Sequence, residues 1–555
     1  MSRTDNNRGM SVAGITIALC FAILLAGIIP SVRSECVNDM PAVCSPTTKT
    51  AATGWTVLVY INGDCNIETN AIASFLDISS VGSRTNMNVV ALFDRINSGE
   101  SWDDTSYGNW GDTKLFHVTS GMEPVPGSAL SDMGELDMGN ASTLTNFVDW
   151  GIGNYTASHY ALFIWDHGAG WPGCCYDNTS NEDRLTPVEL RQSLSSVYNK
   201  TGVKLDVVGF DCCLMATIEV PYELQGYADR FVASEQVISV DSWPFNAILS
   251  ALASNTAMNA SELGNTIVNC YMAKYGTGGS DTLSSLEMSR FSVLSSAMAN
   301  FSTALFFNDT LHSSEISAAR LVTQQYMAGK SNSDDVDIYD FASQLCKKTN
   351  SPALKSLAKS VMAAVNATVE YEGHGIAGAA NSHGIAIYFP REAAYFSKLY
   401  DKGTFELGFT RDTSWDEFLR RHYGFPYIQF VHAPVKSALQ DQPVGITVRI
   451  ISDKPVTVAK VNYRLANESN WHSLNMTKTS GTATDGTYAA QIPGQKAGVM
   501  VYYISASDTS ALNATTPGYD VKIMAQVPDG MPVFLLLPMI TIAVYVLIGR
   551  KKRCL

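Results

Sequence analysis

Two apolar runs, each followed by residues with reactive side chains, constrain the fold of this chain most strongly. Tyr160–Trp165 (YALFIW) leads into His167, and Leu205–Phe210 (LDVVGF) leads into Cys212 and Cys213. Continuous apolar runs of this length are typical of parallel strands that are buried on both faces. The carboxyl ends of such strands share one edge of the sheet, where open α/β folds bind their ligands. The sequence therefore predicts that His167 and a cysteine meet at that edge.

A cysteine beside a histidine can act as a nucleophile whose thiol proton is taken by the imidazole. His167 would serve as the base toward the thiol and later as the acid toward a leaving amine. The backbone N–H groups of Gly168 and Cys213 would form an oxyanion hole, in which each donor contributes roughly 3–4 kcal/mol. A histidine 46 residues before the cysteine also matches the order found in caspases. A cysteine peptidase is therefore the leading interpretation.

Five segments carry a more specific signal: WTVLVYINGD at Trp55–Asp64, WDHGAGW at Trp165–Trp171, FDCCLM at Phe210–Met215, PYEL at Pro221–Leu224 and SHGIAIYFP at Ser382–Pro390. Through these segments, in this order, the chain resembles the clostripain family of cysteine peptidases, which share the caspase-like fold. The resemblance runs from about Trp55 to Pro426. The alternation of apolar strands with helical segments likewise predicts an α/β domain with a mostly parallel sheet and flanking helices.

The nucleophile is either Cys212 or Cys213. Adjacent side chains at a strand end point in opposite directions, so only one of the two faces the cleft. The family's D-x-C-L-M pattern places the catalytic thiol at Cys213, with Cys212 at the position where relatives have alanine. We expect a helix near Met215–Tyr222, whose N-terminal dipole would lower the pKa of the thiol. The alternative is that the two cysteines are buried or disulfide-bonded. Asp166 is a weaker candidate for orienting the imidazole.

Asp211 lies two residues before Cys213. The resemblance implies that this position contributes to an S1 pocket selective for Arg or Lys, because a carboxylate pairs with a guanidinium through charge-assisted hydrogen bonds. Asp241, in the loop Val240–Pro244, is a second candidate for this pocket. The alternative for Asp211 is an aspartate at a strand end that bonds to local backbone. The expected substrate is a peptide or protein with a basic P1 residue.

The segment Cys174–Thr186 joins the histidine strand to the next predicted helix, and its Asn, Ser and Asp content predicts an exposed loop. Exposed polar loops are preferred sites of proteolytic nicking, and relatives with this fold often mature by cleavage here. Arg184 is the only basic residue of the segment, so an Arg-selective enzyme would cleave itself after Arg184. The alternative is an intact loop that Cys174 or Cys175 holds in a disulfide.

No pattern in the sequence is specific for a metal or cofactor site. The Cys174-Cys175 and Cys212-Cys213 pairs lack the spacing of zinc ligands. The acidic run Asp334–Asp340 lacks the spacing and the glycine of an EF-hand. We expect it to be a solvated loop that leads into a helix start at Tyr339–Phe341. Some relatives in the clostripain family use calcium, so calcium stays open as a cofactor.

The chain has 555 residues, which is too long for one core, so we expect two or three domains. The peptidase domain is expected at residues 55–426, after a linker at 34–54. Short alternating strands rich in Thr and Val at 427–526 predict an immunoglobulin-like β-sandwich. A net charge of −14 without a stripe of Lys and Arg argues against a nucleic acid as partner.

Two further segments are apolar enough to interact with a membrane. Residues 1–33, in which Arg3 and Arg8 precede an apolar run, predict a signal peptide or an N-terminal anchor. Residues 531–548 carry no charge and suffice for a C-terminal transmembrane helix, and the basic tail at 549–555 is expected in the cytoplasm. The catalytic region would then be extracytoplasmic, at the cell membrane. Eleven Asn-x-Ser/Thr sequences and eight cysteines that remain for disulfides agree with that placement.

Two other functions are open. One is a catalytically silent surface receptor or adhesin that binds through the cleft and the sandwich. The other is a transpeptidase of similar fold, like legumain or the anchor transamidases. The intact motifs at His167 and Cys213 argue against the first, and the D-x-C-L-M element with an acidic residue at position 211 argues against the second. We therefore expect a membrane-tethered cysteine endopeptidase that cleaves after Arg or Lys.

Overall fold

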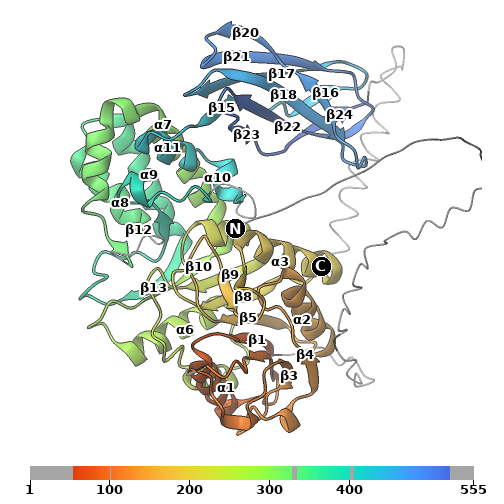
Figure 1. The fold of residues 1–555 in the computed structure, drawn as a ribbon, viewed down its shortest axis with the longest axis vertical. Helices are drawn as coiled ribbons and strands as arrows, with labels where there is room; N and C mark the ends of the chain where they lie inside the picture. The colour runs from red at the N-terminus through yellow and green to blue at the C-terminus, as the bar shows by residue number, and fades with distance from the viewer. Residues whose placement is uncertain (1–39, 41–53, 101, 328–333, 401–405, 526–555) are drawn as a thin grey trace, which may run out of the picture. The chain divides into compact units, whose positions relative to one another are not determined.

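A computed structural model describes residue 40 and residues 54–100, 102–327, 334–400 and 406–525 (Figure 1). The signal peptide or anchor predicted at 1–33, the membrane segment at 531–548 and the basic tail at 549–555 lie outside these residues, as does nearly all of the 34–54 linker. Among the residues described, none of the helices has the length and apolar character needed to cross a bilayer.

A nine-stranded sheet forms the centre of the predicted peptidase region, in the order β13-β10-β9-β8-β5-β1-β2-β3-β4. Its five inner strands are mutually parallel: β9 (Ala228–Ala233), β8 (Leu205–Asp211), β5 (His159–Trp165), β1 (Trp55–Gly63) and β2 (Met87–Arg95). The outer strands pair antiparallel: β3 (Thr113–His117) and β4 (Ser131–Gly134) on one side, β10 (Thr282–Glu287) and β13 (Val369–His374) on the other. The predicted parallel sheet is confirmed, with antiparallel strands at both margins.

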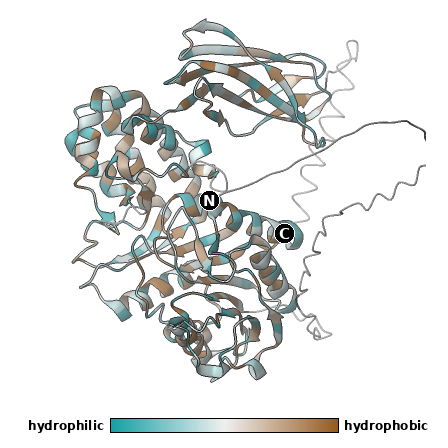
Figure 2. Ribbon diagram, in the orientation of Figure 1, coloured by the Kyte–Doolittle hydropathy of each residue, from teal (hydrophilic) through white to brown (hydrophobic). Residues whose placement is uncertain are grey.

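Side chains of the central strands alternate between two apolar cores. On β1, Leu58 and Tyr60 join one core, whereas Val57 and Val59 join the other. The first core includes α2 (Ala141–Asn154) and α3 (Pro187–Thr201); the second includes α1 (Glu68–Val81), α5 (Phe245–Ser254) and α6 (Ala260–Tyr275). Figure 2 shows the resulting hydrophobic colour along the central strands. Helices cover both faces of the sheet, and this is why the strands read as continuous apolar runs.

The register of β5 and β8 sets the position of the reactive residues. Trp165 on β5 is paired with Asp211 on β8. His167 and Cys213 therefore each follow a paired residue by two positions, and both leave the sheet at its carboxyl edge. The juxtaposition expected from the two apolar runs is thus built into the pairing of these strands.

A second group of helices packs onto the same core as α2 and α3, with helices α7 (Phe291–Arg320), α8 (Ile338–Lys348), α9 (Pro352–Thr368), α10 (Gly408–Asp412) and α11 (Trp415–Tyr423). A small three-stranded sheet contains β11 (Gln325–Tyr326), β12 (Asp335–Asp337) and β14 (Ala386–Tyr388), whose residues come between α7 and α10 in the chain. The solvated loop expected at Asp334–Asp340 is wrong: Asp335 and Asp337 are fully buried, and Asp337 caps α8 by accepting a bond from the Asp340 N–H.

The last described segment consists of strands in two sheets. One contains β15 (Ile428–His432), β17 (Val444–Ser452), β21 (Asp485–Ile492) and β20 (Thr477–Gly481). The other contains β16 (Ser437–Leu439), β24 (Tyr519–Met524), β22 (Gly498–Asp508), β18 (Val456–Leu465) and β19 (His472–Asn475), with β23 (Asn513–Thr515) on β22. Buried residues from both sheets share one apolar core. The all-β character predicted for this segment is confirmed, and the immunoglobulin-like class stays a prediction.

The expectation that eight cysteines pair is wrong for the part of the chain that the structure describes. Its cysteines are all free thiols: Cys65, Cys174, Cys175, Cys212, Cys213, Cys270 and Cys346. The Cys174–Thr186 segment is therefore not held by a disulfide of either of its cysteines.

Candidate active site

Asp166, the first residue after β5, anchors the loop that carries His167. Its carboxylate is buried and accepts hydrogen bonds from Asn62 Nδ2 (2.8 Å), the Tyr176 N–H (2.6 Å) and Cys65 Sγ (3.3 Å). Burial raises the pKa of Asp166 well above its usual range. Asp166 thus ties the β1–α1 loop to the histidine loop, and its carboxylate is occupied by partners other than the His167 ring.

The half-buried imidazole of His167 is instead oriented by Asn66, at the end of the β1–α1 loop. His167 Nε2 lies 2.7 Å from Asn66 Oδ1. Because an amide oxygen accepts, Nε2 carries the proton, and Nδ1 keeps its lone pair. Burial lowers the pKa of His167, so the imidazole is neutral near pH 7. A neutral ring with a free lone pair is the form that can accept a thiol proton.

Gly168 brings the histidine loop against the backbone of Cys213. A Cβ at Gly168 would lie 2.4 Å from the Cys213 carbonyl oxygen, 3.0 Å from its N and 2.9 Å from Cys212 Cβ. No larger residue fits there without displacing the cysteine loop. Gly168 is therefore the point at which the two strand ends touch.

Of the two adjacent cysteines, Cys213 is the accessible one. Cys213 is half-buried, and its Sγ lies 3.4 Å from the Ile238 N–H. Cys212 is only 1% exposed, and its Sγ faces the Ile164 carbonyl oxygen at 3.4 Å inside the core. The opposite orientations agree with the alternation expected at a strand end. No hydrogen bond between described residues joins Cys213 Sγ to the His167 ring.

The helix expected near Met215–Tyr222 begins later and is shorter than predicted, and the dipole effect expected on the thiol is wrong. Leu214 has a positive φ of 65°, and α4 (Glu219–Glu223) starts only later and has five residues. A helix dipole acts within its first turn, so it does not reach Cys213. Burial raises the pKa of the Cys213 thiol, and the Asp211 and Asp166 carboxylates add to that effect. The thiol is therefore protonated near neutral pH, contrary to the expected lowering.

Asp211 holds the loop that carries Asp241. Asp211 is buried, and its Oδ2 accepts hydrogen bonds from Ser242 Oγ and from the Trp243 N–H (3.0 Å). Burial raises the pKa of Asp211 to about 7, and these two bonds oppose the rise. Ser242 itself has a positive φ of 64°, so this turn is fixed in an uncommon conformation. The Asp211 carboxylate thus bonds to a turn 31 and 32 residues further along the chain, rather than to the backbone beside it.

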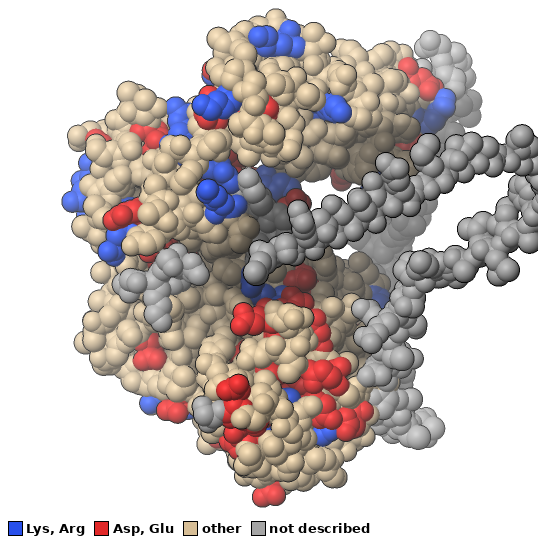
Figure 3. All heavy atoms as spheres, in the orientation of Figure 1, with Lys and Arg blue, Asp and Glu red and all other residues tan. Residues whose placement is uncertain are grey.

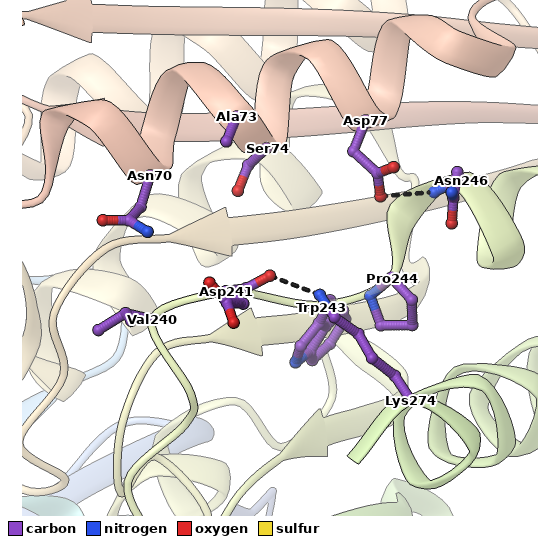
Figure 4. A pocket seen from close by; sticks show the side chains of 10 residues that line it. All are labelled: Asn70, Ala73, Ser74, Asp77, Val240, Asp241, Trp243, Pro244, Asn246 and Lys274. Carbon is purple, nitrogen blue, oxygen red and sulfur yellow. Dashed lines mark hydrogen bonds between the residues drawn. The ribbon is translucent and has the colours of Figure 1, made fainter.

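Asp241 is exposed and lines a pocket of about 440 Å³ between α1 and the Val240–Pro244 loop (Figure 4). Lys274 Nζ donates to the Asp241 carbonyl oxygen (2.6 Å) and the Ser242 carbonyl oxygen (3.1 Å). Asp77 lies on the opposite wall and accepts from the Asn246 N–H at 2.9 Å. The Lys274 contacts leave the Asp241 carboxylate open to the pocket.

A second hollow of about 420 Å³ is lined in part by Ile238, whose N–H contacts the Cys213 thiol. Its lining residues are Gln236, Val237, Ile238, Ser239, Ser280, Asp281 and Met327. Asp281 Oδ1 accepts from the Tyr271 hydroxyl at 3.1 Å. The negative charges of Asp211, Asp241 and Asp281 all act on Tyr275, whose pKa they raise together with burial. Asp281 is the carboxylate that lines this second hollow.

The segment with Arg184 is a hairpin: the turn between its two strands is largely exposed, as predicted, but Arg184 itself lies in the second strand. It consists of β6 (Cys174–Asp177) and β7 (Asp183–Leu185). Arg184 is half-buried, with Nε 3.0 Å from the Pro172 carbonyl oxygen and its guanidinium 5.3 Å from the Tyr176 ring. The following residue, Leu185, is fully buried. The bond after Arg184 is thus protected by strand pairing.

Asn62 and Asn66 were missed as site residues by the sequence analysis. Asn62 lies at the carboxyl end of the strand β1 and Asn66 follows it, and β1 neighbours β5 in the sheet. A signal for them exists: polar residues directly after a buried parallel strand lie at the same carboxyl edge as those after β5 and β8. The order of the strands decides which of these polar ends are neighbours, and it is not apparent from the sequence.

Comparisons with known proteins agree with this architecture. A model of the clostripain family matches residues 59–422, about two thirds of the chain. Clostripain from Hathewaya histolytica is 24% identical over 249 residues, which cover 40% of this chain and 46% of that relative, less than half of its length. An inactive zymogen of a C11 protease from Parabacteroides distasonis superimposes with a TM-score of 0.50 and 18% identity, over 67% of this chain and 99% of that chain. A secreted C11 cysteine protease from Bacteroides thetaiotaomicron superimposes with a TM-score of 0.49 and 17% identity, over 67% of this chain and 100% of that chain. The chain belongs to the clostripain family of cysteine peptidases.

Proposed function

We propose that Cys213 and His167 form the catalytic dyad of this peptidase. The observation that carries the proposal is the packing of Gly168 on the Cys213 backbone, which puts the histidine loop beside the accessible thiol. In the reaction, His167 takes the thiol proton while Sγ attacks the scissile carbonyl carbon. The protonated imidazole then gives its proton to the leaving amine, and the acyl group remains on Sγ as a thioester. Water hydrolyses the thioester with His167 again as base.

The backbone N–H groups of Gly168 and Cys213 are the proposed oxyanion donors. They belong to segments that lie in contact, since a Cβ on Gly168 would lie 3.0 Å from Cys213 N. Fixed backbone donors of this kind stabilise the oxyanion that forms on the carbonyl oxygen, without reorganisation during the reaction. The thiol has no dipole-lowered pKa to rely on, so proton transfer to His167 must accompany the attack.

We further propose cleavage after Arg or Lys. The negative charge of Asp241 at an open pocket, with Asp211 beneath its loop and Asp281 in the adjoining hollow, favours a cationic P1 side chain. Asp241 is the carboxylate proposed to meet the substrate cation directly. Asp211 is buried with its Oδ2 occupied, so its proposed role is to hold the Ser242–Trp243 turn.

The proposed setting is a membrane-tethered, extracytoplasmic enzyme. Its support is the uncharged run at 531–548 with the basic residues after it, and the apolar run within 1–33. Fractionation of cells that express the full chain, beside a chain ending at residue 526, tests it: the full chain should sediment with membranes and the shorter chain should not.

A panel of fluorogenic peptides with Arg, Lys, Asn or Asp at P1 tests the specificity. Arg and Lys substrates should be cleaved, and Asp241→Asn should lower kcat/KM for Arg at least tenfold while keeping the alkylation rate of Cys213 by an uncharged reagent. Asp441→Asn, at an exposed aspartate of the strand-rich segment, is the matched control and should leave kcat/KM unchanged. Equal cleavage of Asn and Arg substrates by the wild type would refute the preference for a basic P1 residue.

A further inference from the structure

Three side chains with different donor atoms meet at the start of the histidine loop. Cys65 comes from the loop between β1 and α1, and Asp166 and His167 directly follow β5. The Cys65 sulfur, an Asp166 carboxylate oxygen and a ring nitrogen of His167 all lie within 4.8 Å of one another. Strands β1 and β5 are neighbours in the sheet, so their carboxyl ends bring these residues together. We call them the Cys-Asp-His group.

The thiol and the carboxylate of this group are buried against each other. Cys65 is 1% exposed and Asp166 is 4% exposed. Cys65 Sγ lies 3.3 Å from Asp166 Oδ1, at the distance of an S–H···O hydrogen bond. An S–H group is a weak donor, so it satisfies a buried carboxylate oxygen poorly. A cation in place of this proton would satisfy the oxygen and the sulfur together.

The carboxylate and the imidazole are each held by a further contact. Asp166 Oδ2 accepts from Asn62 Nδ2 (2.8 Å) and from the Tyr176 N–H (2.6 Å), so Oδ1 is the oxygen that faces the thiol. One ring nitrogen of His167 lies 2.7 Å from Asn66 Oδ1. Outer hydrogen bonds of this kind fix the orientation of side chains that bind a metal ion. The group is therefore already oriented in the absence of any ion.

The surface over the neighbouring strands is acidic. Figure 3 shows Asp and Glu side chains gathered over the part of the molecule that contains β3 and β4, which follow β1 and β2 in the order of the sheet. The full chain carries a net charge of −14. A surface with charges of one sign raises the local concentration of ions of the opposite sign. This region of the molecule therefore attracts cations.

We propose that Cys65, Asp166 and His167 bind a zinc ion. Thiolate sulfur, imidazole nitrogen and carboxylate oxygen are the donors of protein zinc sites, and the sulfur disfavours hard ions such as Mg²⁺. With Zn–S near 2.3 Å and Zn–O near 2.1 Å, a tetrahedral angle places sulfur and oxygen about 3.6 Å apart. The 3.3 Å between Cys65 Sγ and Asp166 Oδ1 is close to that separation. On binding, the ion replaces the S–H proton, which passes to water, and a water molecule completes the shell.

Zinc at this place would switch off the proposed dyad. A neutral imidazole has one lone pair in the plane of its ring. When a metal ion takes that lone pair, the other ring nitrogen carries the proton, so the ring cannot accept the proton of the Cys213 thiol. This effect rests on the proposed role of His167 as the base, whereas the binding of zinc does not. We therefore expect inhibition that a chelator reverses.

Calorimetric titration of the full-length Cys213→Ala protein with Zn²⁺ tests the site without any assay of activity. Removal of Cys213 excludes an ion held between the nucleophile and the imidazole, and excess Mg²⁺ occupies sites made of oxygen atoms alone. This protein should bind one Zn²⁺ with the affinity of the wild type, and Co²⁺ should give thiolate charge-transfer absorption. Addition of Cys65→Ser or of His167→Gln should weaken Zn²⁺ binding at least tenfold, and Cys65→Ser should abolish the absorption. The Tm of each variant without metal shows whether it is folded.

Cys270→Ser is the matched control, since Cys270 on α6 is also a free cysteine but belongs to none of the groups of metal-ligand side chains among the described residues. It should leave the affinity and the Co²⁺ absorption unchanged. In proteins that keep Cys213, Zn²⁺ should inhibit peptide cleavage and EDTA should restore it. Cys65→Ser should need at least tenfold more Zn²⁺ for the same inhibition, relative to its own rate without metal.

The proposal is overturned if the wild type binds no Zn²⁺ at about 100 µM, well above the dissociation constants of protein zinc sites. Loss of binding in Cys213→Ala, or wild-type affinity in both variants of the Cys-Asp-His group, would overturn it as well. If Cys65→Ser does not fold, His167→Gln decides alone. Failure to cleave Arg and Lys substrates would refute the proposed specificity and leave the binding results as they are, so the two proposals fail separately.

Discussion

At the scale of single residues, burial keeps both members of the proposed dyad uncharged. It raises the pKa of Cys213 and lowers that of His167, because a low-dielectric site disfavours the thiolate and the imidazolium alike. In the free enzyme the thiol and the imidazole are therefore both neutral near pH 7. This differs from a preformed ion pair, in which the thiolate is present before the substrate arrives.

The first prediction concerns the pH dependence of thiol reactivity. Only the thiolate is alkylated, so the rate at Cys213 should rise about tenfold per pH unit between pH 6 and 8, with a midpoint above the ordinary thiol pKa of about 8.5. Peptide mapping after timed treatment with iodoacetamide measures the rate at Cys213 alone. A rate that is already constant from pH 5 to 8 would show a thiolate–imidazolium pair and contradict this account.

The second prediction concerns Asn66 as a positioning residue. Asn66→Ala removes the acceptor of the Nε2 proton, and kcat/KM should fall about tenfold, the equivalent of roughly 1.4 kcal/mol for one hydrogen bond. Asn66→Asp places a negative charge on the ring, which favours imidazolium and raises the pKa of His167. The acid limb of kcat/KM should therefore move to higher pH.

Asn97→Ala is the control for these variants, because Asn97 is an exposed asparagine whose side-chain amide donates to the Asn109 carbonyl oxygen at 3.1 Å. Its pH profile should match that of the wild type. An acid limb that stays in place in Asn66→Asp would show that the Asn66 contact does not act on the imidazole.

At the scale of elements, the strands that carry the site could be predicted and their surroundings could not. The runs ending at Trp165 and Phe210 are β5 and β8, because strands covered by helices on both faces need apolar residues throughout. The helix expected after Cys213 begins only at Glu219: Leu214 and Ile218 lie in turns, Thr217 pairs with Ala386, and the Leu214 N–H bonds to the Gln236 carbonyl oxygen. Such long-range partners leave no periodic pattern in the sequence.

The third prediction concerns the β6–β7 hairpin. Cleavage after Arg184 requires the hairpin to open, because Leu185 is buried and paired with Cys174. Self-cleavage should therefore be slow beside peptide turnover but should depend on Cys213. Mass spectrometry should find a new terminus at Leu185 in the wild type and an intact chain in Cys213→Ala. Intact chains in both proteins after prolonged incubation would end this proposal.

At the scale of the whole molecule, the sequence predicts the change from an α/β region to a strand-rich segment near residue 427, since helical periodicity ends there and short alternating strands begin. It also predicts the pairing of His167 with a cysteine loop. It could not predict the contact between Asn66 and His167, because that contact depends on the order of strands in the sheet. The disulfide prediction failed for the described cysteines because it used only their number, whereas Cys174, Cys175 and Cys212 are core residues.

The roles of Cys213 and of the acidic pocket can be tested together by peptide mapping of the full chain after reaction with a peptidyl acyloxymethyl ketone that carries Arg at P1, beside a matched reagent with Gln. The account predicts one adduct, on Cys213, formed at least about 100-fold faster with Arg than with Gln, which corresponds to roughly 2.7 kcal/mol. The adduct should persist in Cys212→Ala and form far more slowly in His167→Ala. An adduct on Cys212, or equal rates with the two reagents, would contradict the account.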